Sequence, residues 1–189
     1  MILLGIAGAA GVGKDTVADY LVDKYNFVKF GFAWPLKAML LAGLGLDPNA
    51  YQSGPQKEAD IPRFGFSYRK AAQTLGTEWG RGLRSDLWLL LAEHRIEWIK
   101  ANLPKVGGIV CCDLRFENEA SMIRHRGGLV LHLKSNRPNT TLGEEAKHVS
   151  ESGVAFLSGD AFIDNSYSIL QLYNMIDWML KDLPKAVPA

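Results

Sequence analysis

The residues that could do chemistry begin in one short stretch, GIAGAAGVGKDTVADYL at positions 5–21. Gly8, Gly13 and Lys14 have the spacing of a phosphate-binding loop (P-loop), whose backbone N–H groups and lysine surround the phosphates of a nucleotide. The next residue is Asp15, at the position where this loop usually has serine or threonine. The spacing predicts a nucleotide site with an altered metal shell.

Asp15 can be explained in two ways. A bare carboxylate beside a triphosphate is repelled, but Mg²⁺ between them makes it tolerable, by direct contact or through water, and Thr16 supplies the hydroxyl one residue later. The alternative is a glycine-rich turn without a ligand, in which Asp15 is a first-turn residue favoured by the helix dipole. The strand expected before the loop and the helix expected after it favour the nucleotide site.

A second polar group follows an apolar run in CCDLRFENEA, positions 111–120. Asp113 ends the run, Arg115 lies two residues on, and Glu119 falls in the helix expected next. At the carboxyl end of a buried strand, Asp113 offers an acceptor for hydroxyl or base groups and Arg115 a planar fork for a phosphate. The alternative is a structural pair, in which Asp113 caps the helix and Arg115 is its ion-pair partner.

Basic residues also gather in SYRKAAQTLGTEWGR, positions 67–81, where Arg69, Lys70 and Arg81 are mixed with small residues. On their own, basic residues on a helix are typical of a solvated face. This third group therefore predicts no chemistry by itself.

The elements that must position these residues alternate between strand and helix. Positions 46–66 have a poor pattern and three prolines, so we expect an irregular excursion there, and Ser67 and Ser85 are candidate helix N-caps. The alternation predicts the α/β class, with a parallel sheet of about five strands covered by helices on both faces. We expect strands at 2–8, 27–31, 107–113, 129–133 and near 161–164, and helices at 14–25, 34–45, 67–76, 86–102, 116–126 and 167–182.

Composition narrows the class of protein. The chain has 189 residues, enough for one domain with a sizeable core, and a formal net charge of +1, which argues against a nucleic-acid or membrane-surface protein. No apolar run reaches the roughly 18 residues that span a bilayer. Cys111 and Cys112 are adjacent in an apolar run and are expected to be buried thiols rather than a disulfide, which fits a reducing cytoplasm.

Taken together, these groups resemble the phage deoxynucleoside monophosphate kinases, within the P-loop kinase group. That family also has aspartate after the P-loop lysine, and its blocks occur here in the same order over most of the chain. The blocks are GAAGVGKDTVADYL near the start, PLKAML (35–40), SYRKAAQTLGTE (67–78), DLRFENEA (113–120), KHVSESG (147–153) and IDNSYSILQL (163–172).

The resemblance implies an ATP:deoxynucleoside monophosphate phosphotransferase, which uses ATP and Mg²⁺ and forms the deoxynucleoside diphosphate. It implies a single P-loop kinase-like domain over 1–189, with an acceptor-binding excursion at about 35–85 and a mobile lid at about 134–150. Its partners would be small molecules, with no nucleic acid or membrane, and a homodimer is left open.

The resemblance also implies roles for individual residues. Three of the residues named below have a structural alternative. For Trp88 the alternative is a core aromatic side chain, and for Arg137 it is a solvated loop arginine. Asn165, which the resemblance places near the adenine of ATP, has a turn residue as its alternative. Lys14, Arg69, Asp113 and Arg115 would be catalytic, and Asp15 would serve the metal. The ATP-binding residues would be Gly11, Gly13, Lys14, Asp15, Thr16, Val17, Arg137 and Asn165, and the acceptor-binding residues Lys37, Arg69, Trp88, Asp113, Arg115 and Glu119.

The chain departs from the family pattern in two places. Positions 46–66 are short compared with the insertion of some members, which leaves the range of acceptors open. Ala10 and Gly11 lack the basic residues of some relatives, so one cationic contact to the acceptor phosphate is either missing or supplied from elsewhere. The competing hypotheses are a P-loop kinase of another small metabolite and a nucleotide-binding module without an acceptor, although no N-K-x-D motif of a G protein is present.

Overall fold

The computed structural model describes residues 1–47, 55–136 and 153–183. The chain divides into two compact units: Met1–Gly31 with His94–Ala189, and Phe32–Glu93. We call them the sheet unit and the helical unit, and each is described by itself. The predicted excursion at 35–85 falls within the helical unit, whereas most of the predicted lid lies outside the described residues. The single-domain assignment stays a prediction.

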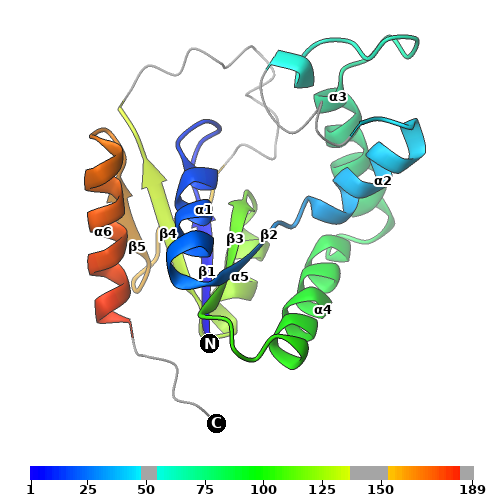
Figure 1. Ribbon diagram of the computed structural model, residues 1–189. Helices are drawn as coiled ribbons and strands as arrows, with labels where there is room; N and C mark the ends of the chain where they lie inside the picture. Colours follow the sequence, from blue (N-terminus) through cyan, green and yellow to red (C-terminus); the bar gives the residue numbers. More distant parts are fainter. Residues whose placement is uncertain (48–54, 137–152, 184–189) are drawn as a thin grey trace. The chain divides into compact units, whose positions relative to one another are not determined.

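The sheet unit is built on five parallel strands in the order β2-β3-β1-β4-β5 (Figure 1). This confirms the predicted fold class and the predicted number of strands. Each strand lies within a residue or two of its expected position, because short apolar runs bounded by glycine and polar residues are typical of buried parallel strands. The strands are β1 (Ile2–Ala7), β2 (Phe27–Phe30), β3 (Gly108–Leu114), β4 (Leu129–Lys134) and β5 (Ala161–Asp164).

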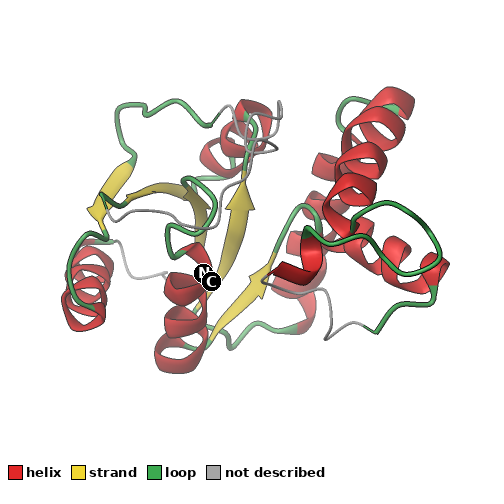
Figure 2. Ribbon diagram, turned by 90° about the horizontal axis from the view of Figure 1, so that it is seen from above, coloured by secondary structure: helices red, strands yellow, loops and turns green. Residues whose placement is uncertain are grey.

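Helices lie on both sides of the sheet, as the view in Figure 2 shows. Helix α1 (Lys14–Tyr25) buries Val17, Ala18 and Leu21, the face expected from its sequence, and it contacts α6 (Ile169–Asp182). Helix α5 (Glu117–His125) packs on β1 and β4. The core beneath α1 and α6 is formed by apolar side chains such as Leu4, Ile6, Leu131 and Ile176.

The sheet order explains why the P-loop is in a position to bind a ligand. Strand β1 lies between β3 and β4, and Ala7 at its end is in register with Leu114 on one side and His132 on the other. The chain passes from β1 to β2 and from β3 to β4, so the connections from the neighbouring strands β1 and β3 lead toward opposite edges of the sheet. The loop after β1 therefore lies at the point where the strand order reverses. Open α/β sheets bind ligands at such points, beyond the carboxyl ends of the strands.

The helical unit contains α2 (Trp34–Leu44), a 3₁₀ turn (Pro55–Lys57), α3 (Tyr68–Gln73) and a π-helix (Thr74–Arg81). Helix α4 (Leu87–Asn102) begins in this unit and ends in the sheet unit. Ser67 caps α3 as expected, since its side chain accepts a hydrogen bond from the Lys70 N–H. Helix α4 starts one residue later than expected, so Asp86 rather than Ser85 directly precedes it.

The π-helix is a regular element that the sequence did not predict. It forms where the indole N–H of Trp88 donates a hydrogen bond to the Gly76 carbonyl at 2.7 Å. The Trp88 ring also lies so close to Gly80 that a Cβ on Gly80 would come within 2.3 Å of it. Because helix backbone is π-helical mainly where tertiary contacts demand it, local sequence pattern does not reveal it.

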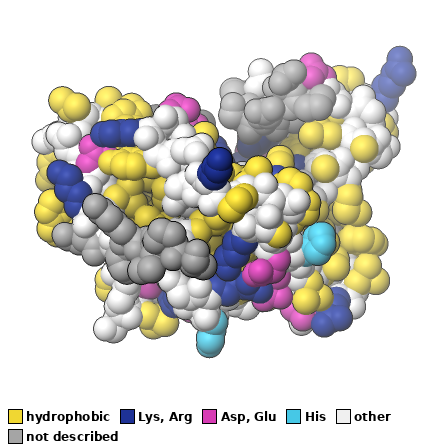
Figure 3. Space-filling model, turned by 60° about the horizontal axis from the view of Figure 1, so that its bottom comes forward, with side chains coloured by type: hydrophobic (Ala, Val, Ile, Leu, Met, Phe, Trp, Pro, Cys, Tyr) yellow, Lys and Arg dark blue, Asp and Glu magenta, His cyan; other side chains and the backbone are white. Residues whose placement is uncertain are grey.

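The surface agrees with the composition. Positively and negatively charged side chains lie near one another on the face shown in Figure 3, as a formal net charge of +1 suggests. In the described parts of the chain, no helix combines the length and the apolar character needed to cross a membrane.

Candidate nucleotide site

The P-loop is held in shape by two glycines that have no room for a side chain. Gly8 and Gly13 have φ values of 147° and 101°, which side chains disfavour. A Cβ on Gly8 would lie 2.4 Å from the Leu133 carbonyl oxygen, and a Cβ on Gly13 would lie 2.6 Å from the Asn165 amide nitrogen. The loop therefore rests directly on the ends of β4 and β5.

Lys14 lies across the loop that it is expected to serve. Its Nζ donates to the carbonyl oxygens of Gly8 at 2.7 Å and Ala9 at 2.8 Å. The ammonium group is thus already at the loop, at the start of α1, where the helix dipole adds positive potential. This geometry suits a cation that exchanges carbonyl oxygens for phosphate oxygens.

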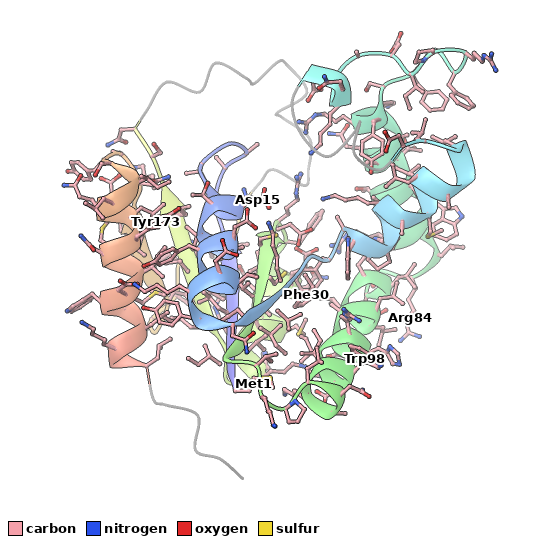
Figure 4. All side chains as sticks on the ribbon, in the orientation of Figure 1. Met1, Asp15, Phe30, Arg84, Trp98 and Tyr173 are labelled. Atoms are coloured by element: carbon pink, nitrogen blue, oxygen red, sulfur yellow. The ribbon has the colours of Figure 1, made fainter. Side chains whose placement is uncertain are left out.

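Asp15 has a partner that the sequence did not reveal. In the first turn of α1, where Figure 4 labels it, Asp15 lies 2.8 Å from the Nζ of Lys29 on β2, and Lys29 also pairs with Asp19 at 2.8 Å. Burial lowers the pKa of Lys29, but hydrogen bonds with the two carboxylates outweigh it, so the pKa is raised and the ammonium stays charged. The ion pair with Lys29 is thus a second interaction, besides the helix dipole, that stabilises Asp15 in the first turn of α1.

The donors near the P-loop fit Mg²⁺ better than a metal held by protein alone. The described residues contain no group of three or more His, Cys, Asp or Glu side chains that could hold a metal ion. Mg²⁺ is commonly bound by one or two carboxylates together with water and substrate phosphates. The Asp15 side chain is 80% exposed, so it is accessible to an ion that arrives with a nucleotide.

The end of β3 forms a second part of the site. Asp113 lies against Gly31, where a Cβ would come within 2.5 Å of its carboxylate, and the Cys111 thiol lies 3.4 Å from the same carboxylate. Burial raises the pKa of Cys111 well above its usual value, so this neighbour is a neutral thiol. Asp113 thus lies beside β1 at the edge of the sheet where the P-loop is found.

Glu119 orders the turn that carries Arg115. Its side chain is buried, 3% exposed, and its Oε2 accepts hydrogen bonds from the Arg115 N–H at 2.9 Å and the Phe116 N–H at 3.2 Å. Phe116 is the N-cap residue of α5, so Asp113 does not cap this helix as the structural alternative supposed. Burying a carboxylate is costly unless it is hydrogen-bonded, which indicates a positioning role for Glu119.

Asn165 lies on the other side of the P-loop. Its amide nitrogen donates to the Val12 carbonyl at 2.9 Å, and its backbone is tied to the end of β4 by bonds to Lys134 and Ser135. The expected position near the adenine of ATP is not tested by these contacts. The P-loop, Asp113, Arg115 and Asn165 all lie at the carboxyl end of the sheet.

Three predicted acceptor residues lie in the helical unit. Lys37 is exposed on α2, and Arg69 on α3 donates to Glu58 at 2.5 Å. Trp88 is 5% exposed with its N–H bonded within the unit, which fits the core-aromatic alternative. The prediction for Arg137 lies outside the described residues.

The comparisons with known proteins bear on the site as a whole. Residues 56–176 match the model of the family described as "Deoxynucleotide monophosphate kinase". A protein of Acanthamoeba polyphaga mimivirus named "Putative deoxynucleotide monophosphate kinase" is 32% identical, over 93% of this chain and 94% of that protein. The chain belongs to the deoxynucleotide monophosphate kinase family. The family match begins after the P-loop, whereas the mimivirus relative aligns over nearly all of both chains.

A second viral relative agrees with this family, and a solved structure shares the fold. The deoxynucleoside-5′-monophosphate kinase of Escherichia phage T5 is 26% identical, over 96% of this chain and 98% of that protein. A solved structure from Chloroflexus aurantiacus, described as a "putative kinase", has a TM-score of 0.51 and 10% identity, over 95% of this chain and 96% of that one. The structural likeness shows a shared fold alone.

Proposed function

We propose that this kinase transfers the γ-phosphoryl group of ATP to a deoxynucleoside 5′-monophosphate, so that ADP and the deoxynucleoside diphosphate are formed. One observation carries the proposal beyond family membership. The P-loop with Lys14 follows β1, and the Asp113–Arg115 turn lies at the end of the neighbouring strand β3. Both lie at the point where the strand order of the sheet reverses. A donor site and an acceptor site on adjacent strand ends are what a transfer between two phosphates requires.

On the donor side, the backbone N–H groups of Gly11 to Val17 bind the phosphates of ATP. Lys14 leaves the carbonyl oxygens of Gly8 and Ala9 and places its charge on the transferring phosphoryl group. In phosphoryl transfer the protein mainly positions the reactants and stabilises charge on the equatorial oxygens, so a mobile ammonium at the end of the loop suits the task.

Asp15 and Thr16 would hold Mg²⁺ together with the ATP phosphates. The ion, when bound, screens the phosphate charges from each other. Asp15 must then exchange its contact with Lys29 for the ion. This exchange is feasible because Asp15 is exposed and an exposed ion pair contributes only about 1 kcal/mol or less.

On the acceptor side, Arg115 binds the phosphate of the monophosphate with its planar guanidinium, and Asp113 orients the nucleotide. An acceptor phosphate is already a competent nucleophile, so Asp113 need not act as a strong base. We propose that Lys37 and Arg69 also bind the acceptor nucleotide, for which Arg69 must release Glu58. Glu119 positions Arg115 through the Arg115 backbone N–H.

A panel of acceptors tests the proposal. Turnover of ATP is measured with each ribo- and deoxynucleoside monophosphate and with no acceptor. We expect fast turnover with at least one deoxynucleoside monophosphate and little without an acceptor, since uncoupled hydrolysis wastes ATP. Turnover that is independent of any monophosphate would indicate the nucleotide-binding module, and turnover only with another phosphorylated metabolite would indicate a different kinase.

A further inference from the structure

The P-loop accepts a hydrogen bond from a side chain that is distant in the sequence. We infer that Asn165 is a positioning residue, which fixes the peptide between Val12 and Gly13 so that the P-loop is ready to bind phosphate. The direct evidence is the hydrogen bond from its Nδ2 to the Val12 carbonyl at 2.9 Å. The two residues are 153 positions apart and belong to the same sheet unit.

Peptide geometry turns this contact into an orientation of the loop. The Val12 carbonyl and the Gly13 N–H belong to one planar trans peptide, in which the two groups point in opposite directions. A bond that holds the carbonyl toward Asn165 therefore directs the Gly13 N–H away from Asn165. That N–H precedes Lys14 and is one of the donors expected to bind the phosphates of ATP.

The fit between Asn165 and Gly13 is close. A Cβ on Gly13 would lie 2.6 Å from the Asn165 amide nitrogen, so any larger residue at position 13 would displace the amide. Gly13 is needed for its φ of 101° and also for this approach. The last glycine of the loop and Asn165 are therefore matched to each other.

Asn165 itself is held from two directions. Its N–H donates to the Lys134 carbonyl at 2.7 Å, and its carbonyl accepts from the Ser135 hydroxyl at 3.1 Å. The neighbouring Ser166 bonds Asp164 through both its N–H and its hydroxyl. These contacts hold the Asn165 backbone in place, so that its side chain reaches the Val12 carbonyl without a bound nucleotide.

The phosphate-binding part of this inference rests on the proposed function, but the contact can be tested without a ligand. Asn165→Ala removes the donor, and the nearly isosteric Asn165→Asp replaces it by an acceptor that repels the Val12 carbonyl. Ser166→Ala is the matched control, since it disturbs the same turn by removing the hydroxyl that bonds Asp164 and the Asn136 N–H. We expect the backbone amide resonance of Gly13 to shift in both Asn165 variants and to stay in place in Ser166→Ala.

Calorimetry then separates a positioning role from contact with adenine. Affinity is measured for MgATP and for magnesium tripolyphosphate, which has the phosphates but no base. We expect Asn165→Ala to weaken both by a similar factor, roughly 5- to 10-fold for one lost hydrogen bond, and Asn165→Asp to weaken both further.

Two results would overturn the inference: an unshifted Gly13 resonance in both variants, or a loss of affinity for MgATP with none for tripolyphosphate. If the wild type bound neither compound, the proposed function would fail, and the Gly13 resonance alone would decide the role of Asn165.

Discussion

The two ends of helix α1 each carry a lysine–aspartate ion pair, and the pairs are built differently. At the carboxyl end, Lys24 lies 2.6 Å from Asp177 on α6. The hydroxyl groups of Tyr20 and Tyr25 both donate to the same carboxylate at 2.7 Å, and the Tyr20 ring is stacked on Tyr173 at 3.9 Å. This end fastens α1 to α6.

At the amino end, the Asp15 carboxylate lies 2.8 Å from the Nζ of Lys29, and the Asp15 side chain is 80% exposed. Lys29 divides its charge between Asp15 and Asp19. The first carboxylate is thus half-buried and accepts hydrogen bonds from several donors, whereas the second can leave its partner at little cost. The packed end therefore supports stability, whereas the exposed end is accessible to other partners.

The largest expected effect is at the amino end. Lys14→Ala removes the charge aimed at the transferring phosphoryl group, so turnover should fall by roughly 10²-fold or more in a folded protein. Lys24→Ala is the matched control at the other end of the helix, and its turnover should stay close to wild type. Steady-state kinetics and thermal melting of both variants make the comparison, and near-normal turnover in Lys14→Ala would contradict the P-loop assignment.

The next effect concerns Arg115. Lysine cannot reproduce the planar fork of arginine, so Arg115→Lys should lower kcat/KM for the monophosphate about 30-fold, which corresponds to about 2 kcal/mol. The affinity for ATP should change little. The matched control is Arg126→Lys, since the Arg126 guanidinium pairs with Glu97. Asp113→Asn should impair use of the acceptor while the fold is kept. Equal losses of ATP binding and acceptor use in the Arg115 and Asp113 variants would show a structural pair.

At the packed end, a change in Asp177 should affect stability rather than turnover. Asp177→Asn removes the charge that binds Lys24 and weakens the acceptor of two tyrosine hydroxyls, so the free energy of unfolding at pH 7 should fall by about 1 kcal/mol. Turnover should stay within about 2-fold of wild type. Chemical denaturation checks the first value, and a large loss of turnover at unchanged stability would reverse the roles of the two ends.

The pH dependence of stability sharpens this assignment. The hydrogen bond from Lys24 is the main reason why the pKa of Asp177 falls from 3.8 to about 2. Between these values the unfolded chain binds more protons, so the contribution of Asp177 is complete above about pH 4 and is lost as the pH falls toward 2. The difference in unfolding free energy between wild type and Asp177→Asn should shrink over that range, and a constant difference would contradict the ion pair.

The smallest expected effect is the competition for Asp15. Lys29→Met removes the cation that competes with Mg²⁺, so half-maximal turnover should need roughly 3-fold less Mg²⁺. Asp15→Ala should raise the Mg²⁺ requirement, Asp15→Ser should recover part of the activity, and Asp15→Ala combined with Lys29→Met should titrate like Asp15→Ala alone. Identical Mg²⁺ titrations in all variants would favour a purely structural ion pair.

The sequence predicted the local features of this molecule better than its long-range contacts. Helix α1 was predicted at the residues that form it, because its buried face and the glycines before it are local signals. Lys29 was missed because a lysine within an apolar strand does not identify its partner. The contact of Asn165 with Val12 joins residues 153 positions apart, and the π-helix depends on Trp88, so neither has a local pattern that reveals it.

Transfer of a labelled phosphoryl group tests the central claim most directly. ATP labelled at the γ-phosphoryl group is incubated with a deoxynucleoside monophosphate and the enzyme, with Lys14→Ala as the control, and the products are separated. We expect the label in the deoxynucleoside diphosphate, formed in equal amount to ADP, and almost none in the control. Label that appeared only as inorganic phosphate, at a rate independent of the monophosphate, would contradict the proposed function.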